Sequence, residues 1–304
     1  MMFLLRRAAW IAVTLWVVYT ISFALMRSVP GGPFSSERQV PEAIKRNIEE
    51  RYRLNDPLWK QYRDNLALAL TGDFGLSFKL GDFSVNDVIY QGFPVSASLG
   101  ILAITFALFF GLTAGVVSAA RRNTGWDVLS MGLAALGVAV PNFVLASLAI
   151  IVFVFWLNWV PAGGWGTLRQ LILPALCLSA PVAAYLARLT RAAMLDVLNL
   201  DYIRTAYAKG LSERQVVLRH ALRGSLLPAI SYLGPATAAV LTGSPIIERI
   251  FNIPGMGSHF VEAALQRDYT LSLGVIMAYT ALLLGMNTLV DLSYALIDPR
   301  VKME

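Results

Sequence analysis

Long uncharged runs alternate with short charged segments along most of the chain. A helix needs about 20 mainly apolar residues to cross the hydrocarbon core of a bilayer. The runs predict an all-α polytopic membrane protein with six transmembrane helices, with both termini on the same side of the membrane. The predicted spans lie within residues 8–26, 95–120, 128–168, 170–187, 224–247 and 269–290.

The third run, residues 128–168, is too long for one straight span and barely long enough for two. Two spans would reverse the orientation of everything downstream and place the most basic segment of the chain outside the cell, against the positive-inside rule. We therefore predict one span that kinks at Pro141 and leaves the membrane near Trp156, where a loop rich in Gly and Trp begins.

Residues 30–94 form the only long hydrophilic stretch, and their charges are mixed rather than of one sign. We expect a small folded element outside the cytoplasm, with Asp56 capping a helix that Pro57 opens. Two sets of apolar residues at helical spacing support this: Ile44, Ile48 and Tyr52, and then Trp59, Tyr62 and Leu66. The expected organisation is a first span at 1–29, this insertion at 30–94, and a core membrane domain at 95–304.

Composition and charge agree with a membrane protein. Hydrophobic residues make up 57% of the chain and charged residues 14%, and the formal net charge is +6. Basic residues gather in cytoplasmic loops of membrane proteins, so this charge needs no nucleic acid partner. Arg6 and Arg7 precede the first span and Arg121 and Arg122 follow the second, which predicts a cytoplasmic N-terminus. No small-x-small cleavage site follows Met26, so we expect an uncleaved first span.

The segment 188–228 interrupts two apolar runs with a dense set of basic residues. We expect a short amphipathic helix over 201–209, a break at Gly210, and a second helix starting near Ser212. A helix, a turn and a helix make a rigid projection, and its apolar residues are expected to meet a groove of a partner. Those residues are Tyr202, Ile203, Ala206 and Leu211, and the cations around them are Arg188, Arg191, Arg204, Lys209, Arg214, Arg219 and Arg223.

Few residues suggest chemistry within the spans. The lone Cys177 allows no internal disulfide, and no Gly-Lys pair exists for a phosphate-binding loop. Ser258 and His259 are the only pair available to an intramembrane enzyme, but adjacent residues lack the geometry of a catalytic triad. Ion-coupled carriers need ionisable groups near the midplane, which are scarce here. Polar residues that either line a path or join helices are Asn142, Ser179, Thr242, Ser244, Glu248 and Asn287.

The sequence from Arg204 to Gly210, followed by Leu227 and Pro228, resembles the EAA loop of permease subunits in bacterial binding-protein-dependent ABC importers. Arg204 and Thr205 depart from the general motif, as in the oligopeptide and dipeptide branch. Further segments resemble the B-type oligopeptide permeases over essentially the whole chain: 30–34, 54–57, 72–75, 84–87, 242–244, Glu248, 253–257, 267–269 and 298–300.

This resemblance implies the type I ABC importer permease fold in the bacterial inner membrane, with cytoplasmic termini. It implies a subunit without enzyme activity or cofactor of its own that forms half of an oligopeptide path. The implied partners are a C-type permease, two cytoplasmic ATPases that carry ATP and Mg, a periplasmic peptide-binding protein and membrane lipid. The implied alternatives for the cargo are dipeptides, glutathione or another small ligand. ATPase coupling would fall to Asp201, Tyr202, Ile203, Arg204, Thr205, Ala206, Lys209, Gly210 and Leu211.

Overall fold

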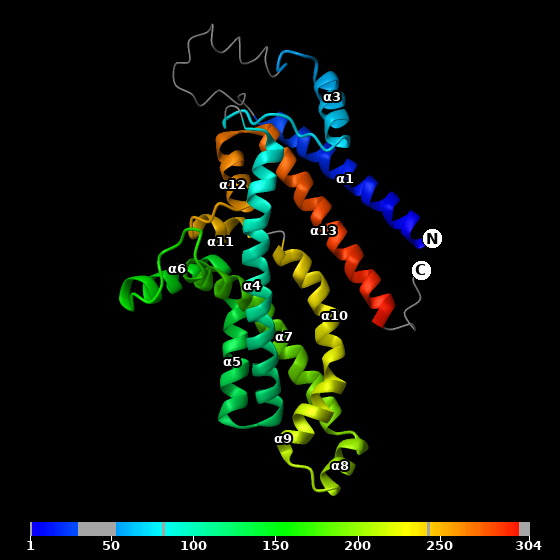
Figure 1. Ribbon diagram of the computed structural model, residues 1–304, viewed down its shortest axis with the longest axis vertical. Coiled ribbons are helices and arrows are strands. Elements are labelled where there is room, and N and C mark those ends of the chain that lie inside the picture. Colours follow the sequence, from blue (N-terminus) through cyan, green and yellow to red (C-terminus); the bar gives the residue numbers. More distant parts are fainter. Residues whose placement is uncertain (1, 30–52, 81–82, 242–243, 298–304) are drawn as a thin grey trace.

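The computed structural model describes residues 2–29, 53–80, 83–241 and 244–297, and the regular elements within these ranges are helices (Figure 1). Five of them are long and apolar enough to cross a membrane, and a bent pair makes a sixth if it is one span. The five are α1 (Met2–Ser28), α4 (Val85–Ala120), α7 (Leu168–Leu198), α10 (Leu222–Leu241, with the helical residues 213–221 before it) and α13 (Tyr269–Ile297). The all-helical membrane fold is confirmed.

The bent pair consists of α5 (Gly125–Ala139) and α6 (Asn142–Ala149), which the π-helix η1 (Ile150–Trp156) continues. The break lies at Pro141, as predicted, but the two arms differ in direction by 110°, so the kinked span is better described as a broken span or a re-entrant segment. Val140 has extended backbone, which a following proline favours, and Pro141 begins the new helix without an N–H to donate.

Helix α4 begins ten residues earlier than the uncharged run suggests, because a capping box starts it. The Ser84 hydroxyl accepts a hydrogen bond from the Asp87 amide at 3.0 Å, and the Asp87 carboxylate accepts one from the Ser84 amide at 3.3 Å. The helix then continues past Pro94. The predicted boundary at residue 94 therefore falls inside a continuous helix.

Helices α4 and α7 pack along each other and form the centre of the fold. Their contact is close because small residues face it: a Cβ atom on Gly111 or Gly115 would overlap the Ala183 carbonyl or the Thr190 side chain. Leu99 on α4 and Leu186 on α7 are fully buried in the main apolar cluster. Small residues at helix contacts are the usual means of close packing in membranes, where lipid removes the hydrophobic drive.

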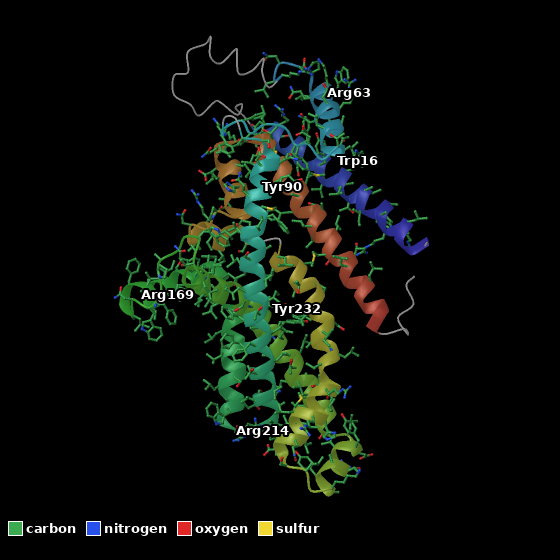
Figure 2. The ribbon with its side chains drawn as sticks, in the orientation of Figure 1. Trp16, Arg63, Tyr90, Arg169, Arg214 and Tyr232 are labelled. Atoms are coloured by element: carbon green, nitrogen blue, oxygen red, sulfur yellow. The ribbon has the colours of Figure 1, made fainter. Side chains whose placement is uncertain are left out.

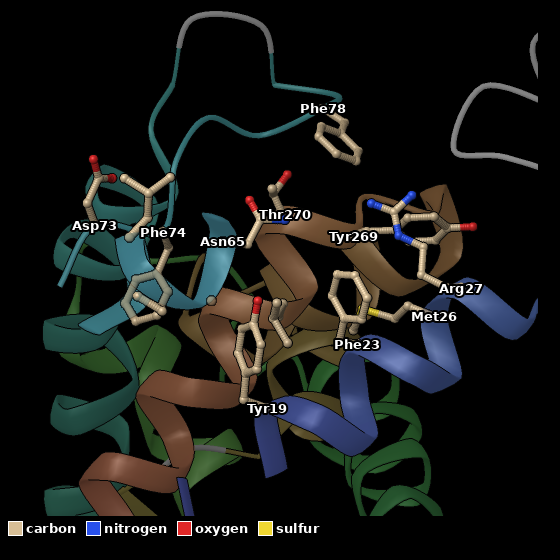
Figure 3. A pocket seen from close by; sticks show the side chains of 14 residues that line it. Tyr19, Phe23, Met26, Arg27, Asn65, Asp73, Phe74, Phe78, Tyr269 and Thr270 are labelled. Carbon is tan, nitrogen blue, oxygen red and sulfur yellow. The ribbon is translucent and has the colours of Figure 1, made fainter. Parts of the chain in front are cut away.

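Helix α3 (Leu58–Leu70) docks on α1 at one end of the molecule. Tyr19 is buried there and donates to the Tyr62 carbonyl oxygen at 3.3 Å. Arg27 lies over the Tyr269 ring (Figure 3).

Two details of the prediction for α3 were wrong: Pro57, not Asp56, is the N-cap residue, and the Trp59 side chain is exposed. Asp56 pairs instead with Lys60, at 2.9 Å. Ile44, Ile48 and Tyr52 lie outside the described residues.

The fifth predicted span ends earlier than expected, at Leu241, rather than at Ile247. A separate short helix α11 (Pro245–Ile250) follows, because Ser244 caps it and Pro245 occupies its first position. Helix α12 (Met256–Gln266) then leads to α13. Thr242 lies outside the described residues.

Candidate functional site

A compact projection, residues 199–221, joins α7 to α10 and is called the knob below. It contains α8 (Asp201–Ala208), α9 (Glu213–Gln215) and the π-helix η2 (Val216–Ala221), which runs directly into α10. Gly210 has φ +79°, a left-handed conformation that glycine adopts without strain, and Ser212 begins α9 through a capping box with Gln215. The helix, turn and helix predicted from sequence are confirmed. The knob lies at the end of the molecule opposite α3 (Figure 1).

The inner face of α8 is covered by the chain itself, which corrects the sequence-based hypothesis about its apolar surface. Ile203 is 1% exposed and Ala206 is 5% exposed. Both belong to a buried cluster, so neither is accessible to a partner. Other members of this cluster are Ala119 from α4, Met194 from α7, and Val216, Val217 and Ala221 from η2, with Leu211 partly buried at its edge.

The outer face of α8 carries aromatic and basic side chains. Tyr202 and Tyr207 are each 46% exposed, and Arg204, Thr205 and Lys209 are exposed too. Arg204 pairs with Asp201 at 3.1 Å, and both side chains are largely in solvent. Aromatic side chains and arginine are the types enriched at protein interfaces. Tyr207 was not singled out in the sequence, although it lies on the same side of α8 as Arg204.

An ion pair fixes α5 to α7 near the knob. Arg191 donates to both carboxylate oxygens of Asp127, at 2.9 and 3.0 Å, and the Ser118 hydroxyl on α4 donates to the same carboxylate. Asp127 is 6% exposed. A buried ion pair of this kind needs such additional hydrogen bonds to offset desolvation. Sequence reasoning missed Asp127, although a lone acidic residue ahead of a long uncharged run was a usable signal.

A second buried carboxylate, Glu248 in α11, holds the other end of α10 in place. Its side chain is 0% exposed and accepts hydrogen bonds from the Ser96 hydroxyl at 2.8 Å and from the Ser258 amide at 3.1 Å. Burial raises the pKa of Glu248, and the hydrogen bonds oppose that rise. A Cβ atom on Gly255 would overlap the carboxylate, so the loop can approach only because glycine is there. Glu248 therefore joins α4, α11 and α12 and does not line an open path in this structure.

The other polar candidates occupy different settings. Ser179 is buried, donates to the Leu176 carbonyl oxygen at 2.8 Å and borders an apolar groove of about 550 Å³ between α4, α5 and α7. Ser244 caps α11. Asn142 is the first residue of α6, and Asn287 is partly exposed on α13.

The Ser258 hydroxyl donates to the Gly255 carbonyl oxygen at 2.8 Å, not to His259, so the geometry gives no support to Ser258 as a catalytic nucleophile.

The knob and α3 lie at opposite ends of the molecule, and one charged side chain at each end marks their positions. Arg214 lies in the knob, whereas Arg63 on α3 lies at the far end of the molecule (Figure 2). The helices α7 and α10 both reach the knob, and η2 makes its connection to α10 continuous. A force applied to the knob would thus be transmitted directly to two helices of the core.

Known proteins resemble this chain over nearly its whole length. The oligopeptide transport system permease protein OppB of Escherichia coli K12 is 47% identical over 302 residues, covering 99% of each chain. The dipeptide transport system permease protein DppB of Bacillus subtilis 168 is 46% identical over 301 residues, covering 99% of this chain and 98% of its own.

Among solved structures, an inward-facing form of the MetNI methionine ABC transporter shares the fold, with a TM-score of 0.53 and 16% identity. The similarity covers 69% of this chain and 94% of that one. Residues 111–303 match the family described as binding-protein-dependent transport system inner membrane component. The chain therefore belongs to this family and is a permease component of an ABC importer, whose ATPase is a separate subunit.

Proposed function

We propose that this chain forms half of the path by which an ATP-driven importer moves oligopeptides into the cytoplasm, and that the knob receives the motion of an ATPase subunit. The observation that carries the coupling role is the division of α8 into a face buried in its own chain and an outer face with tyrosines and cations. The first face makes the knob rigid, and the second offers an interface.

The proposed mechanism builds on this arrangement. ATP and Mg²⁺ bind to the two partner ATPases, which approach each other when ATP is bound. Each knob moves with its ATPase, and because α7 and α10 are joined to the knob they tilt with it. Packed helices switch between discrete arrangements rather than deforming continuously, so the path, formed with a second C-type permease, opens alternately to the two sides.

The proposed orientation places the knob and both termini in the cytoplasm of a bacterium, across the inner membrane from a periplasmic peptide-binding protein. The basic residues support it, since the Arg121–Arg122 turn between α4 and α5 and the cations of the knob lie at the same end of the molecule. The helix α3 would then face the periplasm.

Oligopeptides are the proposed cargo because the relatives OppB are named for oligopeptide transport. The DppB relative of nearly equal identity makes dipeptides the second candidate. Uptake of tri- to pentapeptides in competition with dipeptides, measured in the reconstituted importer, separates the two. Preferential uptake of dipeptides would overturn the proposed cargo and leave the coupling role standing.

The coupling role is tested by Gly210→Trp in the importer reconstituted with its partners in liposomes. Gly210 is exposed at the tip of the knob, and tryptophan there adds bulk at the interface and strain at positive φ. If the substitution removes about 2 kcal/mol of interface energy, the affinity of the ATPase for the knob falls about 30-fold. We expect uptake to collapse while the subunit remains in the membrane.

The matched control is Gly210→Asn, because asparagine tolerates the left-handed conformation without a bulky side chain. We expect this variant to keep most of its uptake. Normal peptide uptake in Gly210→Trp would show that the knob does not couple.

A further inference from the structure

A pocket of about 470 Å³ with a mixed polar and apolar lining lies between α11, α12 and the loop that precedes α7. The side chains that matter are Trp165, Arg249, Asn252, His259 and Glu262, and they are called the outer pocket below. The helices that form it lie in the half of the molecule that contains α3, away from the knob (Figure 1). In the orientation proposed above, the outer pocket lies in the periplasmic half of the molecule.

The floor of the outer pocket is rigid. The Gly164 amide donates to the Phe251 carbonyl oxygen at 2.8 Å, and the Ile253 amide donates to the Glu248 carbonyl oxygen at 2.8 Å. Phe251 is 0% exposed and Ile253 is 1% exposed. The pocket is thus built on the segment that the buried Glu248 carboxylate fixes. A site that is already ordered loses little conformational freedom when a ligand binds.

The buried Glu248 carboxylate also borders the outer pocket, but it already accepts hydrogen bonds from Ser96 and Ser258. The exposed charges of the pocket are one of each sign, at close range. An Arg249 nitrogen and a Glu262 oxygen are 3.4 Å apart, and the two side chains are 50% and 47% exposed. A contact this long and this exposed adds little to stability. The guanidinium has five N–H donors in a planar fork, well suited to a carboxylate. The Trp165 ring, 40% exposed, lines the same pocket.

A ligand with only one charge does not match this pocket. A lone anion on Arg249 would be repelled by Glu262, and a lone cation on Glu262 would be repelled by Arg249. A molecule with both charges would replace the exposed Arg249–Glu262 ion pair with two ion pairs to the ligand. Pockets of 300 to about 1,000 Å³ hold small ligands. The lining therefore favours a small zwitterion with an apolar part.

We propose that the outer pocket is a docking site for a short peptide, with its terminal carboxylate on Arg249, its terminal ammonium on Glu262 and a side chain against Trp165. This inference rests on the proposed function as a peptide importer and adds a place where the cargo meets the permease. Asn252 and neutral His259 supply further hydrogen-bonding groups, because burial lowers the pKa of His259.

The test uses the complete permease complex in lipid nanodiscs, without the binding protein, titrated calorimetrically with trialanine, N-acetyl-trialanine and trialanine amide. Each blocked terminus removes one charge-assisted hydrogen-bond set of about 1.5–3 kcal/mol, which corresponds to roughly 10- to 150-fold weaker binding. We expect trialanine to bind saturably and both blocked peptides to bind more weakly by such factors.

Two variants assign the termini. In Arg249→Ala, trialanine and its amide should bind equally, and in Glu262→Gln, trialanine and its acetylated form should bind equally. Arg63→Ala on α3 is the matched control, since it removes an exposed arginine from the same half of the molecule, and it should bind all three peptides like the unaltered complex. Melting temperatures close to that of the unaltered complex confirm that the variants are folded.

Two outcomes would overturn the docking site: no saturable binding of trialanine, or equal binding of all three peptides. Uptake measured in parallel keeps this failure distinct from failure of the proposed function. ATP-dependent peptide uptake without binding at the outer pocket rejects only the docking site. Absence of ATP-dependent uptake of any peptide rejects the importer function itself.

Discussion

The knob and the α11–α12 segment connect α10 to its neighbours at opposite ends, and they are held by different chemistry. The knob packs through apolar side chains around Ile203 and Met194. The α11–α12 segment is organised around the buried carboxylate of Glu248 and its hydrogen bonds. Apolar contact is non-directional, whereas hydrogen bonds lose strength when their geometry changes. The knob is therefore an apolar joint, and the other end is a polar joint fixed by hydrogen-bond geometry.

The largest expected effect comes from removing the fixed joint. Glu248→Ala leaves the Ser96 hydroxyl and the Ser258 amide without their acceptor in a buried site. Removing one partner of such a network costs about 3 kcal/mol or more. We expect a clear loss of folded protein and a lower melting temperature in detergent.

The matched control is Glu262→Ala, which removes a carboxylate that is 47% exposed, and its melting temperature should change little. Equal effects of the two substitutions would show that the Glu248 network is not what holds the segment.

A smaller effect is expected at the apolar joint, where the two faces of α8 should respond differently. Ile203→Ala empties a buried site and should lower stability by about 2–3 kcal/mol. Tyr207→Ala trims a half-exposed side chain and should change stability by about 0.5 kcal/mol or less.

Tyr207→Ala should nevertheless weaken ATPase binding by about 1–2 kcal/mol, as expected for an aromatic interface residue. Thermal unfolding and ATPase pull-down measure the two quantities separately. The division of α8 into two faces would be contradicted if Tyr207→Ala destabilised the chain as much as Ile203→Ala.

The sequence was sufficient to predict the helices of the knob, because Gly210 and Ser212 are strong local signals. It could not show which partner covers Ile203 and Ala206. Amphipathic spacing identifies an apolar face, but the face can be covered by another subunit or by α4 and η2 of the same chain. Only the tertiary arrangement decides between them.

The same limit applies elsewhere. Pro141 marked where the third run breaks, but the 110° angle depends on how α6 packs against α7 and α11. The role of Glu248 was hidden because its partners, Ser96 and Ser258, come from other helices and Ser96 is distant in sequence. By contrast, the early start of α4 had a local signal, the Ser84 and Asp87 capping box, which lies outside the uncharged run.

The claim that the outer face of α8 meets an ATPase is tested most directly by cysteine cross-linking. Cys177 is the chain's single cysteine and is buried, so replacing it by alanine gives a background for single cysteines. Thr205→Cys places a thiol on the exposed face, and the neighbouring Ala206→Cys places one on the buried face. The assembled importer is treated with a short bifunctional thiol reagent and an ATPase carrying single cysteines. The account predicts cross-links to the ATPase from position 205 and none from position 206. Equal cross-linking from both positions, or none from 205 in an importer that transports peptide, would contradict it.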